Sequence, residues 1–385
     1  MKRRLVITTE IISPYRIPVF NALAQHPDVD LHVIFLAETD PSTRRWKVYT
    51  DEIRFSYEVL PHWRRRVAGY NLLLNRGVAA GLEAARPDVI VCGGYGYLAS
   101  WRVLGWARRH QVPVFLWSES NQQDRRRGMP HVEMLKRYFI AACSGSIVPG
   151  KSAAAYMAAF GVPRERIFVA PNAVDNAFFS AAASEARRRG TELRRQFSLP
   201  ERYFLCAGRL ISAKGIFDLL SAYSVLAPEL RREVGLLFVG DGVEQPELEA
   251  RAAAVRPGVI RCTGFAHREQ LAVYYALAEA FVFPTHTDPW GLVVNEAMAC
   301  GLPIVATEAG GCVEDLVQEG ENGYVVPSAN VTKLAEAMAA FARDPQLAAR
   351  MGQRSARLVQ GFSPELCAAG FATAAGVPRT VSQND

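Results

Sequence analysis

Short apolar stretches alternate with longer segments of helical periodicity along the whole chain. Stretches this short and rich in Val, Ile and Phe are typical of strands buried on both faces of a sheet. They lie at 5–8, 31–36, 89–92, 114–117, 146–148 and 167–170, and then at 203–207, 235–239, 259–262, 280–283, 303–306 and 323–326. Because strand and helix alternate throughout, the pattern predicts an α/β fold of parallel sheets covered on both faces.

The interval between the two sets of strands predicts a domain boundary. Residues 174–199 are polar and rich in alanine, and the 385-residue chain is too long for one ordinary core. We therefore predict two doubly wound, Rossmann-like domains of about six strands each, at 1–172 and 173–362, with a C-terminal helix near 363–378 packing back on the first. Ligands bind beyond the carboxyl ends of such strands, so we expect an interdomain cleft.

Composition narrows the cellular setting. The seven cysteines form no CxxC pair, and most lie in apolar runs, so we expect reduced core thiols and neither disulfides nor a zinc site. The apolar run after Met1 is too short for a signal peptide, and no stretch is long enough to span a membrane. We expect a cytoplasmic protein, ordered up to a short tail at 380–385.

The segment from Asp288 to Gly311 carries the strongest chemical signal. Residues 291–300 predict a helix that begins directly after a loop and ends at Gly301. A helix start presents free N–H groups and a positive dipole end, which suit a phosphate. Glu296 falls more than one turn into this helix, on the face of Leu292 and Val293, where a carboxylate could accept two ribose hydroxyls. Taken alone, Glu296 would more often be an ordinary exposed glutamate.

A second signal, Gly208-Arg209 followed by Lys214-Gly215, comes directly after the first strand of the second domain. Two cations five residues apart at a strand end can converge on one diphosphate, the leaving group of a nucleotide-sugar. Taken alone, an Arg and a Lys in a loop would more often be ordinary solvated side chains.

These two segments resemble the donor-binding signature of retaining glycosyltransferases of the GT4 family, which have the GT-B fold. The resemblance implies that Arg209 and Lys214 act on the diphosphate, that Glu296 binds the nucleotide ribose and that Asp288 faces the donor sugar. The family usually has Glu where this chain has Asp288, which shortens the reach by one methylene. Retention of configuration, a UDP- or GDP-hexose donor, and a glycan, lipid-linked or small-molecule acceptor are implied by the resemblance, with no cofactor and no metal.

The resemblance covers most of residues 203–330 and weakens outside them. It implies donor-binding roles near Gly240, Gly264 and Phe265, besides Gly208, Gly291, Leu292 and Val293. In the first domain, the cleft candidates are Tyr15, Arg16, Gly94, Tyr95 and Glu119. The His that many members carry there has no counterpart at a strand end of this chain, and the sequence does not say which residue replaces it.

Two other motifs lead to different functions. Gly94-x-Gly96-x-x-Ala99 with Glu119 matches a dinucleotide fingerprint, so an NAD-linked oxidoreductase is one alternative, and a non-catalytic nucleotide-sugar-binding protein is another. Asp28-Val-Asp30 resembles a metal-binding DxD, but it precedes its strand and so lies at the wrong edge of the sheet. We interpret it as a turn.

The net charge of +6 raises the question of an anionic partner. Nucleic acid is disfavoured because no reader motif is present. Basic clusters at 64–66, 108–109, 125–127 and 136–137 lie near Trp63, Val67, Tyr70 and Met129. The ordinary interpretation is a solvated surface. The alternative is peripheral contact between the first domain and an anionic membrane.

Overall fold

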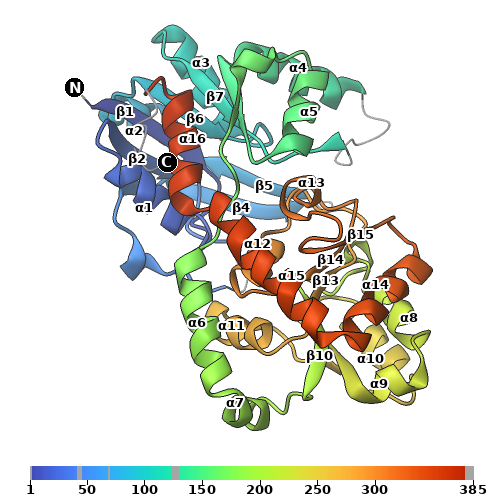
Figure 1. Cartoon of the computed structure of the whole chain (residues 1–385). Coiled ribbons are helices and arrows are strands. Elements are labelled where there is room, and N and C mark those ends of the chain that lie inside the picture. The colour runs from blue at the N-terminus through green and yellow to red at the C-terminus, as the bar shows by residue number, and fades with distance from the viewer. Residues whose placement is uncertain (1, 41–45, 68–69, 123–129, 378–385) are drawn as a thin grey trace. The chain divides into compact units, whose positions relative to one another are not determined.

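The structure is a computed structural model that describes residues 2–40, 46–67, 70–122 and 130–377. The chain divides into two compact units, one formed by Met1–Val174 with Ser363–Asp385 and the other by Asp175–Phe362. Each unit contains one large parallel sheet with helices packed against it (Figure 1).

The sheet of the first unit has the strand order β3-β2-β1-β6-β7-β8-β9, and every neighbouring pair is parallel. The strands are β1 (Arg3–Thr9), β2 (Val29–Phe35), β3 (Ser56–Val59), β6 (Val89–Gly93), β7 (Val114–Trp117), β8 (Gly145–Val148) and β9 (Ile167–Val169). Successive residues of β1 enter different cores: Leu5 and Ile7 pack in one cluster and Val6 in another. The sheet is therefore buried on both faces, as its continuous apolar strands require.

Helices cover both faces of this sheet. They are α1 (Ile17–Gln25), α2 (Val78–Ala85), α3 (Leu98–Arg109), α4 (Pro130–Ala142), α5 (Lys151–Ala159) and α16 (Pro364–Ala374), with 3₁₀ turns at Thr50–Glu52 and Arg164–Arg166. In the sequence, α16 follows the entire second unit, but in the structure it packs against α1 and β9 of the first unit. Phe371 on α16 contacts Trp117 edge to face at 5.2 Å, which ties the chain's last helix to the end of β7.

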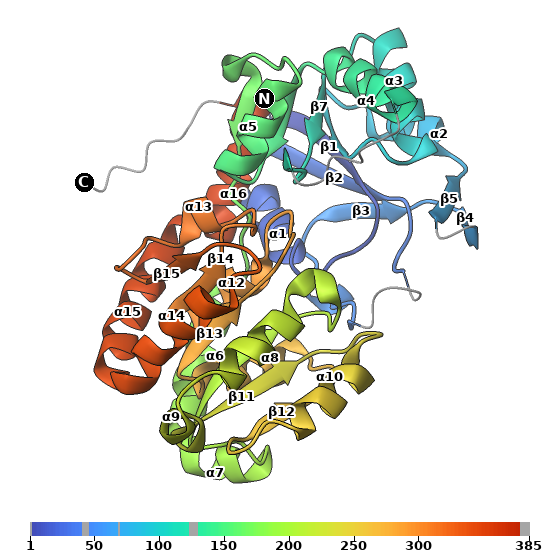
Figure 2. The same ribbon diagram turned by 90° about the vertical axis from the view of Figure 1, so that its right-hand side faces the viewer.

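The first unit also contains an antiparallel hairpin of β4 (His62–Val67) and β5 (Tyr70–Asn75), which stands apart from the parallel sheet (Figure 2). The sequence pattern does not predict β3, β4 or β5. The first sheet accordingly has seven strands where about six were expected.

The sheet of the second unit has the order β12-β11-β10-β13-β14-β15 and is also parallel throughout. The strands are β10 (Arg202–Ala207), β11 (Val234–Val239), β12 (Ile260–Cys262), β13 (Ala280–Phe283), β14 (Ile304–Thr307) and β15 (Gly323–Val326). The central strands β10, β11 and β13 are almost completely buried. Their carboxyl ends all reach one edge of the sheet, so the loops that follow them lie close together.

The helices of the second unit connect these strands. They are α6 (Asn176–Arg188), α7 (Gly190–Gln196), α8 (Ile216–Ser224), α9 (Pro228–Glu233), α10 (Gln245–Ala253), α11 (Arg268–Ala276), α12 (Leu292–Ala299), α13 (Val313–Leu316), α14 (Val331–Arg343) and α15 (Pro345–Leu358), with 3₁₀ turns at Ser212–Lys214 and Val359–Gly361. Every strand predicted from the apolar pattern occurs within two residues of its expected ends. The predicted α/β fold with parallel sheets is therefore confirmed.

The described cysteines form no disulfide, and all but Cys262 are buried. None of the helices in the described ranges is long and apolar enough to cross a membrane. The tail at 380–385, for which the sequence predicts disorder, lies outside the described residues.

Candidate functional site

The loops after β10, β11 and β12 are joined through their backbones at the carboxyl edge of the second sheet. The amide of Gly208 donates to the carbonyl of Val239 at 2.9 Å, and the amide of Gly240 donates to that of Gly264 at 2.8 Å. Gly240 has a φ of 133°, and a Cβ there would lie 1.9 Å from the carbonyl oxygen of Gly208. Only glycine fits, and the three loops form one rim with Phe265 40% exposed beside it.

The loops after β10 and β13 are joined by an ion pair. The ammonium of Lys214 lies 2.5 Å from a carboxylate oxygen of Asp288 and donates to the carbonyl of Thr287 at 3.2 Å. Each of the two charged side chains keeps 19% of its surface exposed. The pair is therefore accessible at the sheet edge, and Asp288 is the anionic partner of Lys214.

Arg209 is exposed just beyond the end of β10, and no ion pair with it is found among the described residues. It lies at the same strand end as Lys214, as the sequence predicts. Of these two cations, Lys214 is therefore paired and Arg209 faces solvent.

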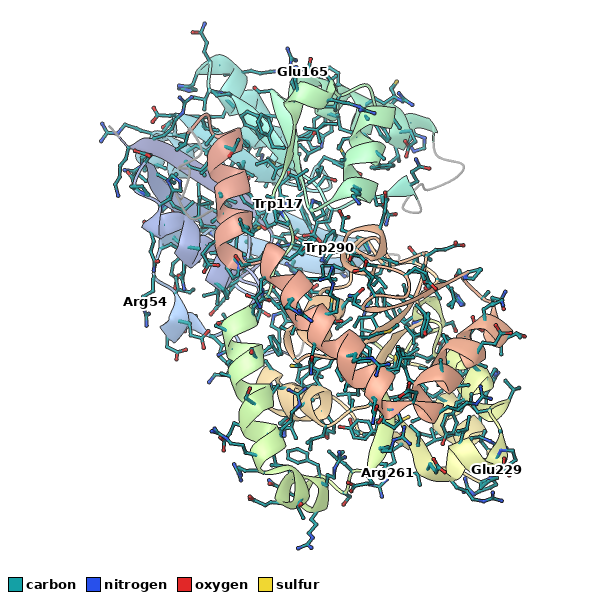
Figure 3. The ribbon with its side chains drawn as sticks, viewed as in Figure 1. Arg54, Trp117, Glu165, Glu229, Arg261 and Trp290 are labelled. Carbon is teal, nitrogen blue, oxygen red and sulfur yellow. The ribbon has the colours of Figure 1, made fainter. Side chains whose placement is uncertain are left out.

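Helix α12 begins directly after the loop that carries Asp288. Gly291 precedes it with a φ of 98°, and a Cβ at this position would lie 2.5 Å from the Phe283 ring. The neighbouring Trp290 (Figure 3) donates its indole N–H to the side chain of Asn295 at 2.9 Å, which fixes the first turn of the helix. Leu292 and Val293 remain partly exposed at the helix start. The geometry matches the predicted helix start and leaves its first turn accessible.

Glu296 lies within α12 but is only 1% exposed. Its carboxylate accepts a hydrogen bond from the hydroxyl of Tyr275 on α11 at 2.8 Å. Burial raises the pKa of Glu296 to about 7, an effect that the Tyr275 hydrogen bond partly opposes. Glu296 is therefore not the exposed helical glutamate that a bare sequence would favour, and Tyr275 is a neighbour that the sequence pattern did not reveal.

This raised pKa predicts an unusual pH dependence of stability. The folded state holds the Glu296 proton more tightly than the unfolded chain, where the pKa is 4.5. As pH rises from about 4.5 to about 7, the free energy of unfolding therefore falls by about 3 kcal/mol in total. The Glu296→Gln variant lacks this titration, so its stability relative to the natural protein should rise between about pH 5 and about pH 8. Urea unfolding of both proteins at both pH values measures the change, and an unchanged difference would contradict it.

The loop after β14 supports the Asp288 segment from the other side. The amide of Gly311 donates to the carbonyl of Asp288 at 2.9 Å, and Gly310 forms an isolated bridge with Asp288. A Cβ on Gly311 would lie 2.0 Å from the carbonyl oxygen of Pro289. The glycine pair Gly310-Gly311 therefore holds the loop of Asp288 in place.

In the first unit, two of the candidates form a partly buried ion pair. The Arg16 guanidinium contacts Glu119, which follows β7, and donates to the side chain of Asn172 at 2.8 Å. It also lies 4.4 Å from the ring centre of Trp117, labelled in Figure 3. Burial lowers the pKa of Arg16 to about 10, so the guanidinium stays charged and needs this carboxylate. About a third of the Glu119 side chain remains exposed.

The other first-unit candidates lie on separate contacts. The ring of Tyr15 packs edge to face on Trp46 at 5.7 Å. Tyr95, in the loop after β6, lies 5.4 Å from the ammonium of Lys136. Gly94 beside it has a φ of 95° and an open space where a Cβ would stand. The described residues thus join Arg16 to Glu119 and leave Tyr15 and Tyr95 on contacts of their own.

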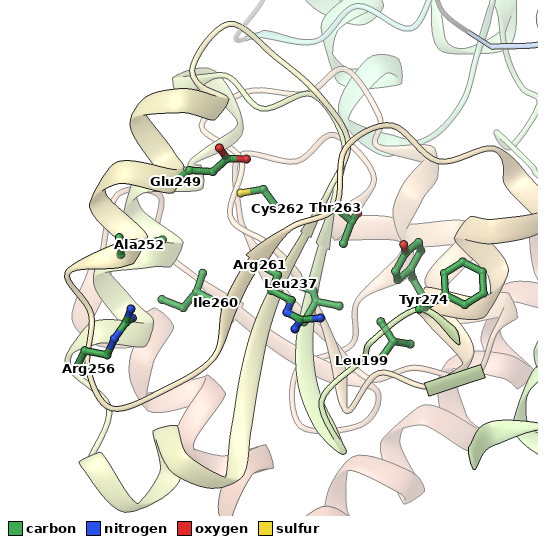
Figure 4. A pocket seen from close by; sticks show the side chains of 12 residues that line it. Leu199, Leu237, Glu249, Ala252, Arg256, Ile260, Arg261, Cys262, Thr263 and Tyr274 are labelled. Atoms are coloured by element: carbon green, nitrogen blue, oxygen red, sulfur yellow. The ribbon is translucent and has the colours of Figure 1, made fainter. Parts of the chain in front are cut away.

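The Asp28-Val-Asp30 motif and a cavity along β12 are the remaining candidates for a site. Asp28 lies in a turn, as interpreted, but Asp30 is the second residue of β2, so its predicted position before the strand is wrong. Its carboxylate pairs with Arg4 at 2.8 Å at the amino edge of the first sheet. No cluster of His, Cys, Asp or Glu that could hold a metal occurs in the described part of the chain. A cavity of about 560 Å³ follows the edge strand β12 (Figure 4). It is lined by Phe197, Leu199, Leu237, Glu249, Ala252, Ala253, Arg256, Ile260, Arg261, Cys262, Thr263 and Tyr274.

Comparison with known proteins defines the class. Residues 20–178 match the model of Glycosyltransferase Family 4, and residues 191–358 match that of Glycosyl transferases group 1. The fold is that of HepE from Anabaena, solved with UDP and glucose, with a TM-score of 0.75 and 18% identity over 97% of this chain and 99% of that one. Sucrose-phosphate synthase from Thermosynechococcus elongatus has the same fold, with a TM-score of 0.71 and 23% identity over 96% of this chain and 98% of that one. These folds define a GT-B glycosyltransferase architecture. The chain belongs to the GT4-type glycosyltransferases.

Curated relatives match part of the chain. A D-inositol 3-phosphate glycosyltransferase of Kribbella flavida is 38% identical over 148 residues, which are 37% of this chain and 34% of the relative. An alpha-D-kanosaminyltransferase of Streptomyces kanamyceticus is 32% identical over 185 residues, 47% of this chain and 46% of the relative. The matches thus span less than half of these relatives' lengths. The family membership favours a transferase over the hydride-transfer alternative built on Gly94 and Glu119.

Proposed function

We propose that this chain transfers a hexose from a UDP- or GDP-sugar to a glycan, lipid-linked or small-molecule acceptor with retention of configuration. The observation that carries the proposal is the Lys214–Asp288 ion pair, 2.5 Å long, at adjoining strand ends beside the start of α12. A cation, a carboxylate and a helix start in one place complement a diphosphate joined to a sugar.

In this proposal the diphosphate takes over Lys214 from Asp288. Arg209 and the first amides of α12 supply further positive charge, so the negative charge that develops on the departing phosphate is stabilised by fixed groups. Asp288, released from its ammonium, becomes an acceptor for a hydroxyl of the donor sugar. The side chain of Asp288 is one methylene shorter than the family's usual glutamate. The hydrogen bond from the Gly311 amide to the Asp288 carbonyl fixes the backbone position from which this carboxylate extends.

The nucleotide occupies the rest of the rim in the same proposal. Glu296 binds the ribose, with Tyr275 orienting its carboxylate. Gly208, Gly240 and Gly264 border the base through closely packed backbone, and Phe265 offers an exposed ring beside it. A Cβ at Gly240 would meet the carbonyl oxygen of Gly208 at 1.9 Å, whereas Gly208 and Gly264 have open space where a Cβ would stand. The nucleotide can therefore approach the backbone closely at these two glycines.

The bond between the anomeric carbon of the sugar and the phosphate oxygen breaks, and its electron pair stays on the phosphate. The acceptor hydroxyl attacks the anomeric carbon from the face on which the phosphate leaves. The departing phosphate oxygen takes the hydroxyl proton, so charge and atoms balance without an enzymic nucleophile. Arg16 and Glu119 belong to the acceptor side, where the partly exposed carboxylate of Glu119 is an acceptor for a sugar hydroxyl. The free thiols of the chain fit the reducing cytoplasm, where nucleotide-sugars are used.

A donor-hydrolysis screen tests this function. Incubated with purified UDP- and GDP-hexoses without acceptor, the protein should release nucleoside diphosphate slowly from one donor and much less from the others. Because Arg209 and Lys214 supply the positive charge, we expect EDTA to leave this rate unchanged. Loss of activity in EDTA with recovery on adding Mn²⁺ would refute the metal-free mechanism. Tight donor binding without any release, even with candidate acceptors, would favour a non-catalytic binding protein.

A further inference from the structure

The β4–β5 hairpin of the first unit has its apolar side facing outward. Its cross-strand pairs include Trp63 with Leu74, Arg64 with Leu73 and Arg65 with Leu72. Trp63, Leu72 and Leu74 are 50%, 43% and 38% exposed, whereas Leu73 is 2% exposed. Solvated hairpins normally place polar residues outside and apolar ones inside. Here the outer face, defined by Trp63, Arg65, Leu72 and Leu74, is largely apolar.

The inner face explains how this arrangement is held. Arg64 points inward, with only 14% of its side chain exposed, and pairs with Asp40 at 2.8 Å and Glu10 at 3.2 Å. Leu73 beside it packs in the core under α2 and α3. Two carboxylates therefore fix a cation inside the unit while three large apolar side chains face solvent.

The last residue of β5, Asn75, is held by hydrogen bonds to two other parts of the unit. Asn75 donates to the carbonyl of Leu36 at 2.6 Å, and Arg102 on α3 donates to the carbonyl of Asn75 at 2.7 Å. Leu98, one turn before Arg102 on α3, is a further exposed apolar side chain of this unit, at 49%. The outer face is thus a fixed surface presented by ordered elements.

The charged side chains that the hairpin segment itself contributes are all basic. Residues 61–82 include Arg64, Arg65 and Arg76 and contain no Asp or Glu. Arg65 lies on the outer face opposite Leu72, and Arg76 follows β5 and is exposed. A partner for an apolar face bordered by arginines must combine an apolar interior with a negative surface. An anionic lipid leaflet does so, and Trp is the side chain most favoured at its interface.

We propose that the outer face of the β4–β5 hairpin docks the protein on an anionic membrane leaflet. Trp63, Leu72 and Leu74 enter the interfacial region, and Arg65 and Arg76 contact lipid phosphates. The proposal does not depend on the donor chemistry. It narrows the membrane contact expected from the sequence to Trp63 and Arg65. Of the other expected basic clusters, 136–137 contains the buried Lys136, and 108–109 lies at the carboxyl end of α3, away from the hairpin in sequence. The side chains of Arg66, Val67 and Tyr70, together with Met129 and the cluster 125–127, lie outside what the structure describes.

Vesicle co-sedimentation tests the proposal. The whole protein should bind vesicles of phosphatidylcholine and phosphatidylglycerol in equal parts more tightly than phosphatidylcholine alone, and more weakly as salt rises. Arg65→Glu should lower the partition coefficient about fivefold or more, and Trp63→Ser with Leu74→Ser about tenfold or more. All of these side chains are exposed, so folding should be unchanged by circular dichroism.

Matched controls come from the same unit. Leu366 on α16 is 47% exposed and Arg164 is exposed near β9, so Leu366→Ser and Arg164→Glu change the same kinds of group elsewhere. Both should bind vesicles like the natural protein. Equal losses in these controls, or no preference for anionic vesicles, would overturn the proposal. So would a hairpin variant that changes the oligomeric state in gel filtration but not vesicle binding, because the face would then join two copies of the chain.

Discussion

Replacing Lys214 with alanine is expected to lower the rate of nucleoside diphosphate release about a hundredfold, the usual loss when one preorganised group is removed from a developing negative charge. Lys214 is the cation that can pass from Asp288 to the diphosphate, since the two groups lie 2.5 Å apart at the sheet edge. The effect should fall on kcat, because the leaving phosphate carries more charge in the transition state than in the bound donor. Initial rates over a range of donor concentrations measure it.

The control for this variant is Lys333→Ala. Lys333 lies on α14, pairs with Glu336 and is 58% exposed, so its removal costs the unit one surface charge and little else. The Lys333→Ala variant should release nucleoside diphosphate at the same rate as the natural protein. If Lys214→Ala also kept its full rate, the diphosphate would not lie at the end of β10. Lys214→Arg should retain part of the activity, since it keeps the charge.

At about pH 8, where the Glu296 carboxylate is mostly ionised, replacing it with glutamine is expected to weaken UDP or GDP binding about tenfold, because a hydrogen bond to a charged carboxylate is worth more than one to a neutral amide. The natural protein should also prefer the ribonucleotide over its 2′-deoxy form, and the variant should lose most of that preference. The comparison isolates the ribose, since the two nucleotides differ in one hydroxyl. Calorimetric titration of both proteins with both nucleotides measures all four affinities.

Tyr275→Phe is the matched control for Glu296. It removes the 2.8 Å hydrogen bond to the carboxylate and leaves the carboxylate itself. A purely structural role for Glu296 predicts that both variants lose the same affinity and that both keep the preference for ribose. That outcome would contradict the proposed ribose contact, whereas a loss confined to Glu296→Gln supports it.

The architecture could be predicted from the sequence because its strands are buried. Runs such as 235–239 are apolar at every position, which in an α/β alternation leaves little choice but a central parallel strand. The hairpin was not predicted for the opposite reason. Its pattern of Arg64 inward and Trp63 outward reverses the usual rule, and it exists because Asp40 and Glu10 pair with Arg64 from distant positions.

The positions of the candidate groups at strand ends followed from topology, but their partners did not. The sequence places Lys214 after β10 and Asp288 after β13, and the parallel order of these neighbours brings them together. It does not say that they pair, since that depends on loop geometry set by Gly311 and Gly215. The burial of Glu296 was equally hidden, because its cover is Tyr275, which resembles any aromatic residue in a helix.

The central claim, a nucleotide-sugar site at the carboxyl edge of the second sheet, is tested most directly by hydrogen exchange with and without the donor found in the hydrolysis screen. Donor should slow exchange of backbone amides in residues 208–215 and 288–296, which contain Arg209, Lys214, Asp288 and the start of α12. Protection confined to the first unit around residues 93–99, or protection along the β12 cavity with none at 208–215 and 288–296, would contradict the claim.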